Sequence, residues 1–135
     1  MRQQFALESE VADAALAARW NAARAGTPDV SPFLTWSWIS AWRETSPAQA
    51  ILLRARRDGG EALALLARAP GTGRRKVLAL NECGDPSLDV AFIEHNGLAG
   101  WRPDSADIEA LARFLAASRA AGPIAGWDEL RLSGV

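Results

Sequence analysis

The sequence is poor in the side chains that most often carry metal and thiol chemistry. It holds one cysteine, Cys83, and one histidine, His95. A single cysteine cannot form an internal disulfide, which fits a reducing compartment. A zinc site needs several converging histidine or cysteine ligands, and the nearby carboxylates lack the spacing of a calcium loop, so we expect no metal. A hydrolase that uses Cys83 as its nucleophile and His95 as its base stays open as an alternative.

A strong net charge and long apolar runs are missing as well. Lysine and arginine together number 15 against 16 aspartates and glutamates, which leaves a net charge of -1. This balance gives no electrostatic attraction toward nucleic acid or an anionic membrane. The first residues, MRQQFALESE, lack the apolar run of a signal peptide, and no stretch approaches the roughly 20 apolar residues that span a bilayer. We therefore expect a cytoplasmic protein with no nucleic-acid and no membrane partner.

What the sequence does contain is a set of clear helix signals. Its 135 residues are close to the commonest single-domain length. After a short extended lead at residues 3–7, capping and stop residues predict helices over residues 9–25, 31–46 and 104–121. In the first helix Leu16, Trp20 and Ala23 share one face, as buried residues would. In the third helix Asp104 is the expected N-cap.

The remaining apolar segments read as strands. Turn residues at 58–60 and 70–73 separate strands near residues 50–56, 62–68 and 76–80, and alternation predicts two more over residues 89–95 and 127–133. The expected fold class is α/β (α+β), with about three helices packed on a mostly antiparallel sheet of five or six strands.

Three tryptophans crowd the second predicted helix. Trp38 and Trp42 follow Leu34 at helical spacing and are expected to be core residues. Trp36 lies on a separate stripe, and we expect it to reach a cleft.

The stretch from Arg68 to Gly73 matches the R-x-x-G-x-G form of a coenzyme A pyrophosphate loop. Such a loop needs free backbone N–H groups and a helix directly after it. Here Pro70 removes one N–H donor, and the residues that follow read as a strand. We interpret the stretch as a hairpin turn.

Four segments together carry a resemblance to a known family. They are SPFLTWSWISAW (31–42), RRDGGEALALLAR (56–68), RRKVLALNECGDPSLDVAFIEHNGL (74–98) and WDELRLSGV (127–135). In this order they resemble the N-terminal half of the CelD/BcsL-type, BioF2-like acetyltransferases, which belong to the GCN5-related N-acetyltransferase superfamily and are similar to the FemAB-type transferases. The resemblance spans residues 10 to 135.

The resemblance implies a GNAT-like half domain over residues 1–135 whose CoA-binding half is absent. Acetyl-CoA or another acyl-CoA is then the implied cofactor, and this chain would recognise the acceptor, a small-molecule amine. The alternative function is a non-catalytic protein-binding or oligomerisation module, which would associate as a homo-oligomer or with the missing second half.

The acidic segment, residues 81–98, supplies most of the candidate binding side chains. Carboxylates gathered at strand ends could bind a cationic amine and orient it. The competing interpretation is that the same residues only form turns and caps. The candidate substrate-binding residues are Asn81, Glu82, Asp85, Asp89, Asn96 and Trp36.

Overall fold

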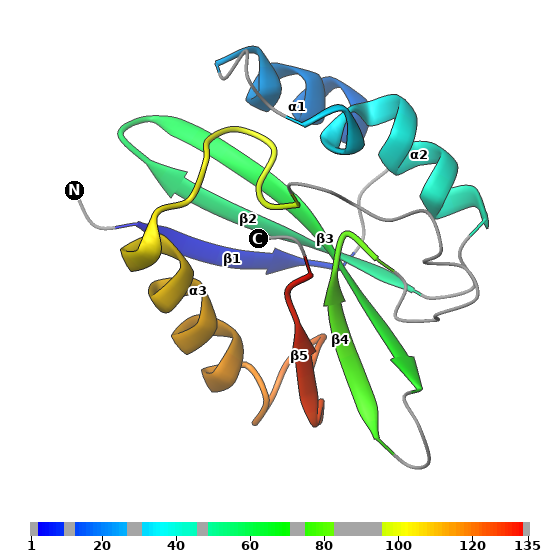
Figure 1. The fold of residues 1–135 in the computed structure, drawn as a ribbon, viewed down its shortest axis with the longest axis vertical. Coiled ribbons are helices and arrows are strands. Elements are labelled where there is room, and N and C mark those ends of the chain that lie inside the picture. The colour runs from blue at the N-terminus through cyan, green and yellow to red at the C-terminus, as the bar shows by residue number, and fades with distance from the viewer. Residues whose placement is uncertain are drawn as a thin grey trace.

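The computed structural model describes residues 3–9, 13–26, 31–45, 49–70, 75–82 and 96–133. These form three helices, one 3-10 turn and five strands (Figure 1). In chain order they are β1 (Gln4–Glu8), α1 (Asp13–Ala25), η1 (Pro32–Leu34), α2 (Trp36–Thr45), β2 (Ala50–Arg57), β3 (Gly60–Pro70), β4 (Lys76–Leu80), α3 (Ser105–Ala117) and β5 (Glu129–Arg131).

The five strands form one sheet in the order β1-β2-β3-β4-β5. Neighbouring strands are antiparallel except β4 and β5, which are parallel because α3 carries the chain back across the sheet between them. The predicted fold class, three helices on a mostly antiparallel sheet, is thus confirmed. The turn between β2 and β3 consists of Asp58 and Gly59, both with positive φ (49° and 78°), as a two-residue hairpin turn requires.

Helices cover both faces of the sheet. In Figure 1, α1 and α2 lie over one face and α3 lies over the other. The central strand β3 is therefore buried on both sides from Ala62 to Ala67, which explains its continuous apolar run. One hydrophobic cluster joins α3 to the sheet through Leu111 and Leu115, and the other joins α1 and α2 to it through Trp20 and Ile39.

The helix predicted over residues 31–46 is interrupted, which corrects that prediction. Pro32 begins a 3-10 turn, and Thr35 is extended (φ -69°, ψ 151°) before α2 begins. The Thr35 hydroxyl accepts a hydrogen bond from the Trp38 N–H (3.3 Å), so it satisfies one of the first N–H groups of α2. Since Leu34 precedes this break, it does not continue the helical stripe of Trp38 and Trp42.

Other boundaries differ in smaller ways. Residues 3–7 were expected only to be extended, but residues 4–8 form the edge strand β1. The last strand is three residues long, and the strand predicted over residues 89–95 lies outside the described residues. The N-cap Asp104 is confirmed as part of a reciprocal capping box with Asp107. On α1, Leu16, Trp20 and Ala23 are buried as predicted.

On the side of β3 that faces β4, the strand pairs with two different segments of the chain. After Leu80 pairs with Leu66, the Asn81 N–H still donates to the Leu65 carbonyl (2.7 Å). The next pair on β3 joins Leu63 to Ala99, through reciprocal backbone hydrogen bonds of 2.7 and 2.8 Å. Ala99 therefore occupies the ladder position that residue 83 would take in an uninterrupted strand.

Gly100 then passes close to β3. A Cβ atom at this glycine would lie 2.7 Å from the Ala62 side chain and from the Glu61 carbonyl oxygen. The absence of a side chain thus allows the returning chain to lie against the sheet.

Candidate functional site

Candidate residues gather at two places, the end of β4 and a groove beside α2. At the end of β4, Asn81 is fully buried and has a positive φ of 52°. Its side-chain oxygen accepts from the Leu65 N–H (2.8 Å), and its amide nitrogen donates to the Asn96 oxygen (2.8 Å) and to the Gly97 carbonyl (2.9 Å). Asparagine tolerates the left-handed conformation better than most residues, which suits it to this strand end.

Asn96 completes this arrangement from the other side of the acidic segment. Its amide nitrogen donates to the Leu80 carbonyl (2.8 Å), and its oxygen accepts from the Gly97 N–H (2.8 Å) as well as from Asn81. Only 7% of Asn96 is exposed. We call the Asn81 and Asn96 side chains the amide pair. Their hydrogen bonds join the end of β4 to residues 96 and 97, just before Ala99 pairs with β3.

The structure thus brings together Asn81 and Asn96, and places Glu82 beside them. Glu82 is buried (8% exposed) directly after Asn81. Asp85 and Asp89, like Cys83 and His95, lie outside the described residues. Both asparagine side chains make three hydrogen bonds within the protein, so the two shape this end of the sheet.

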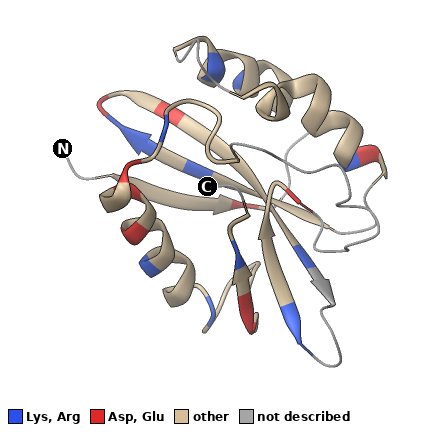
Figure 2. Ribbon diagram, viewed as in Figure 1, with Lys and Arg blue, Asp and Glu red and all other residues tan. Residues whose placement is uncertain are grey.

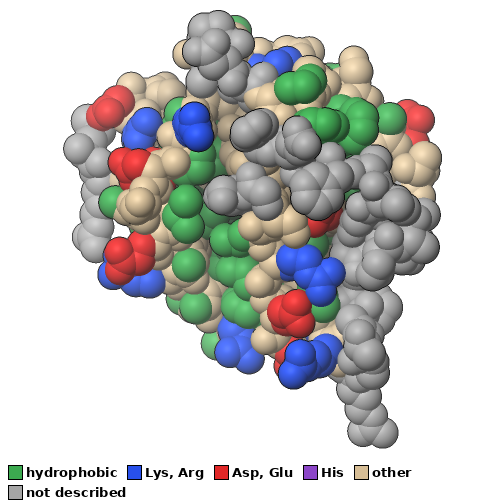
Figure 3. All heavy atoms as spheres, viewed as in Figure 1, with side chains coloured by type: hydrophobic (Ala, Val, Ile, Leu, Met, Phe, Trp, Pro, Cys, Tyr) green, Lys and Arg blue, Asp and Glu red, His purple; other side chains and the backbone are tan. Residues whose placement is uncertain are grey.

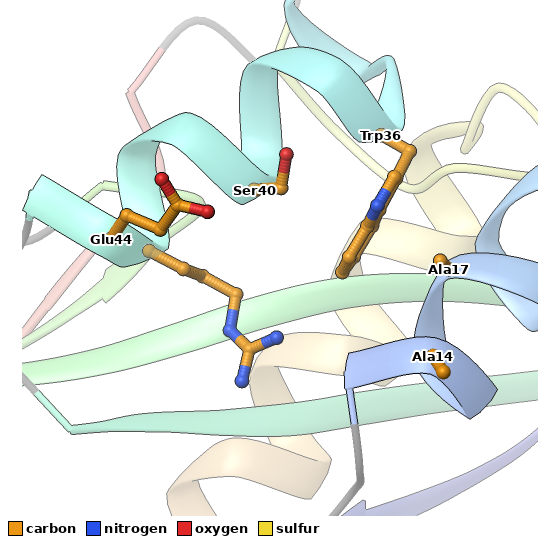
Figure 4. A pocket seen from close by; sticks show the side chains of 6 residues that line it. Ala14, Ala17, Trp36, Ser40 and Glu44 are labelled. Carbon is orange, nitrogen blue, oxygen red and sulfur yellow. The ribbon is translucent and has the colours of Figure 1, made fainter.

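Trp36 lies elsewhere, in an open groove between α1 and α2. The groove has a volume of about 470 Å³ and is lined by Ala14, Ala17, Trp36, Ser40, Arg43 and Glu44. Figure 4 shows the Trp36 ring beside the two alanines, with Ser40 and Glu44 farther along the same helix. The expectation that Trp36 reaches a cleft agrees with this geometry.

The second cluster of hydrophobic residues explains how the groove is held. Trp20 is fully buried and donates its indole N–H to the Leu34 carbonyl (2.7 Å), which ties α1 to the chain just before α2. Trp36 packs against Trp20, with ring centroids 6.2 Å apart at 53°. The aromatic wall of the groove is therefore supported from the core, while the rest of Trp36 faces the open space.

An ion-pair network, which the sequence did not predict, joins α1 to the sheet. Arg19 donates to Glu8 (2.8 Å) and to Glu61 (3.2 Å), and Arg54 pairs with Glu8 (3.2 Å). The hydrogen bond from Arg19 holds the pKa of Glu8 below its usual value. The carboxylates of Glu8 and Glu61 raise the pKa of Arg19. Glu8 and Arg54 meet because β1 pairs with β2, and Arg19 reaches Glu8 and Glu61 because α1 packs on the sheet. Charges of both signs occur on α2, β2 with β3, α3 and β5, whereas β1 carries only Glu8 and β4 only Lys76 (Figure 2).

The start of α3 does not fit the pyrophosphate of an acyl-CoA. The N-terminus of α3 is occupied by Asp104 and Asp107, whose carboxylates accept the local N–H groups at 2.8 and 3.2 Å and would repel a phosphate. Asp107 is further paired with Arg57 (3.3 Å). Of the stretch that matches the pyrophosphate loop, Arg68 to Pro70 belong to β3 and pair with the antiparallel β4, as the hairpin interpretation requires, and residues 71–73 lie outside the described residues.

The part of the chain that the structure describes holds neither a cluster of metal ligands nor a membrane-spanning helix. Within residues 3–9, 13–26, 31–45, 49–70, 75–82 and 96–133, no group of three or more histidine, cysteine or carboxylate side chains could hold a metal ion. In that same part of the chain, no helix has the length and apolar character needed to cross a bilayer.

Comparisons with protein-family models, with curated proteins and with solved structures found no match to this chain.

Proposed function

We propose that this chain binds the amine acceptor of an acyl-transfer reaction, in the groove between α1 and α2. The observation that carries the proposal is an open groove whose lining combines an aromatic face, Trp36, with a carboxylate, Glu44; the lining also includes one cation, Arg43, so an ammonium group is held only where Trp36 and Glu44 outweigh it. A protonated amine is attracted both to the face of an indole ring and to a carboxylate. Ser40 lies between them and adds a hydroxyl group.

The reaction class comes from the family resemblance. The mixed sheet with its three helices agrees with the fold that the resemblance implies, although one fold serves many functions. For the acceptor half of such a transferase, the chemical contribution is to hold the amine in one orientation and to accept its proton. In the proposal, Glu44 orients the ammonium group, and Asp85 and Asp89 stay candidates from the sequence.

The acyl carrier is assigned to a second half or partner in this proposal. Support comes from the capping box of α3, where two carboxylates stand at the helix end that would otherwise attract a phosphate. A thiol-release assay with acetyl-CoA and hexylamine tests this assignment. Release above the buffer rate by this chain alone would show that the carrier is bound here, contrary to the proposal.

Amine binding itself is tested by calorimetric titration with hexylamine and with hexanol, its neutral counterpart. We expect hexylamine to bind and hexanol to bind at least about threefold more weakly, since only the amine gains the cation–π and carboxylate interactions. Equal affinity for the two compounds, or no binding of either, would contradict the proposal.

Matched variants connect binding to the groove. Glu44→Gln and Trp36→Leu should each weaken hexylamine binding about threefold to tenfold. Glu44→Gln should leave hexanol binding unchanged, because hexanol carries no charge for the carboxylate to attract. Glu109→Gln is the control, because Glu109 is an exposed helical glutamate that pairs with Arg113 on the opposite face of the sheet. If the control variant weakens binding as much as Glu44→Gln, the groove is not the site.

A second candidate function is association with another protein. Figure 3 shows apolar side chains gathered on one face between α3 and β5, where Phe114, Leu130 and Leu132 are only partly buried. Strand β5 also forms one edge of the sheet. Light scattering separates the two functions: a stable dimer that binds no hexylamine would favour the binding module.

A further inference from the structure

Asn96 and Gly97 form the dipeptide in which asparagine loses ammonia most readily. In this reaction the Gly97 backbone nitrogen gives up its proton and attacks the Asn96 Cγ atom. A new C–N bond closes a five-membered succinimide ring, the bond from Cγ to the side-chain nitrogen breaks, and ammonia leaves. Water then opens the ring to aspartate or to isoaspartate. Glycine favours the attack because it has no side chain to obstruct it.

The fold holds every reacting atom of this dipeptide. The Asn96 nitrogen that would leave donates to the Leu80 carbonyl (2.8 Å), and the Asn96 oxygen accepts from Asn81 (2.8 Å). The attacking Gly97 nitrogen donates its N–H to the same Asn96 oxygen (2.8 Å). An N–H that points at the side-chain oxygen lies near the plane of the amide, whereas attack on Cγ requires approach from above that plane.

We propose that Asn96 is a deamidation site that the native fold keeps closed and that local or global unfolding opens. Ring closure requires the Asn96 side chain to rotate, which would break its three hydrogen bonds with Leu80, Asn81 and Gly97. Only 7% of Asn96 is exposed, so water cannot replace these partners while the chain is folded. The reaction therefore proceeds through open states of the protein.

The product cannot rebuild the amide pair. Aspartate at position 96 has no donor for the Leu80 carbonyl and places a carboxylate against that oxygen in a buried position. Isoaspartate adds a main-chain atom just before Ala99 rejoins the β3 ladder. A molecule that deamidates at Asn96 while it is open therefore cannot return to the original native structure.

Peptide mapping by mass spectrometry tests the proposal on the whole protein, incubated in mildly alkaline buffer with and without denaturing urea. Conversion of Asn96 should be at least about tenfold slower in the native sample, which corresponds to an opening free energy of about 1.4 kcal/mol or more. Equal rates in the two samples, or no conversion in urea, would each overturn the proposal.

Two controls make the result specific. In urea, Gly97→Ala should slow the conversion, and Asn21, which is exposed on α1 and precedes Ala22, should convert slowly with and without urea. The Asn96→Asp variant mimics one product, and its melting temperature should fall by at least about 4 °C. An unchanged melting temperature would show that the product is tolerated, contrary to the inference.

Discussion

Asn81→Ala gives the sharpest test of the amide pair. The substitution removes three hydrogen bonds at once: one accepted from the Leu65 N–H and two donated to Asn96 and Gly97. Because Asn81 is fully buried, water cannot take the place of the lost side chain. The backbone also has a positive φ of 52°, which alanine adopts less readily than asparagine.

The size of the effect follows from these contacts. A buried N–H without an acceptor, here that of Leu65, costs about 1 to 3 kcal/mol, and each lost donated bond costs about 1 kcal/mol. The left-handed backbone adds about 1 kcal/mol for alanine. We therefore expect Asn81→Ala to lower the free energy of unfolding by about 4 to 6 kcal/mol. Asn81→Gly loses the same bonds without the backbone cost, so it should be about 1 kcal/mol less harmful.

Urea unfolding followed by tryptophan fluorescence measures these differences. Asn21→Ala is the control, because Asn21 is exposed on α1, where alanine is a better helix former and should stabilise slightly. A loss below about 1 kcal/mol for Asn81→Ala would refute the reasoning. An alanine variant at least as stable as the glycine variant would refute the part that depends on φ.

Further predictions concern the ion-pair network, the tryptophans and the helix cap. The pKa of Glu8 is lowered in the folded protein, mainly by the hydrogen bond from Arg19. The Glu8 carboxylate therefore stabilises the fold above its ordinary pKa of 4.5, and this stabilisation is lost as the pH falls through the folded pKa. Urea unfolding at a series of pH values should show the stability difference between Glu8→Gln and the natural chain shrinking over that acidic range. Trp20→Ala should cost about 3 to 5 kcal/mol in the same assay, because Trp20 is fully buried. Trp38→Ala should cost clearly less, because Trp38 is only partly buried, and an equal loss would contradict the assigned burial. Asp104→Ala should cost about 1 kcal/mol through the lost cap of α3, and an unchanged thermal melt would argue against the capping box.

Much of the fold follows from local signals in the sequence. Asp58-Gly59 specifies a two-residue hairpin turn, and Asp104 with Asp107 specifies the start of α3, because both depend on neighbouring residues alone. The break at Thr35 was missed because Pro32 suits the first turn of an α-helix and of a 3-10 turn equally well. The parallel pairing of β4 with β5 is set by the path of α3 across the sheet, which no local pattern encodes.

The candidate site was predicted only in part. Asn81, Glu82 and Asn96 were expected near one another at strand ends; the structure places Asn81 and Glu82 directly after β4 and joins Asn81 to Asn96, while the strand expected before Asn96 lies outside the described residues. Their hydrogen bonds could not be predicted, since they depend on Asn81 and Asn96 both reaching the edge of β3 from distant points in the sequence. Trp36 alone suggested a cleft. That Arg43 and Glu44 also line the groove could not be predicted, because it depends on how α1 and α2 pack together.

The amide pair has a practical consequence for protein engineering. Because the Asn81 and Asn96 side chains hydrogen-bond to each other and to backbone on both segments, one substitution at either asparagine loosens both segments at once. A redesigned version of this protein should therefore keep both asparagines and place its changes elsewhere.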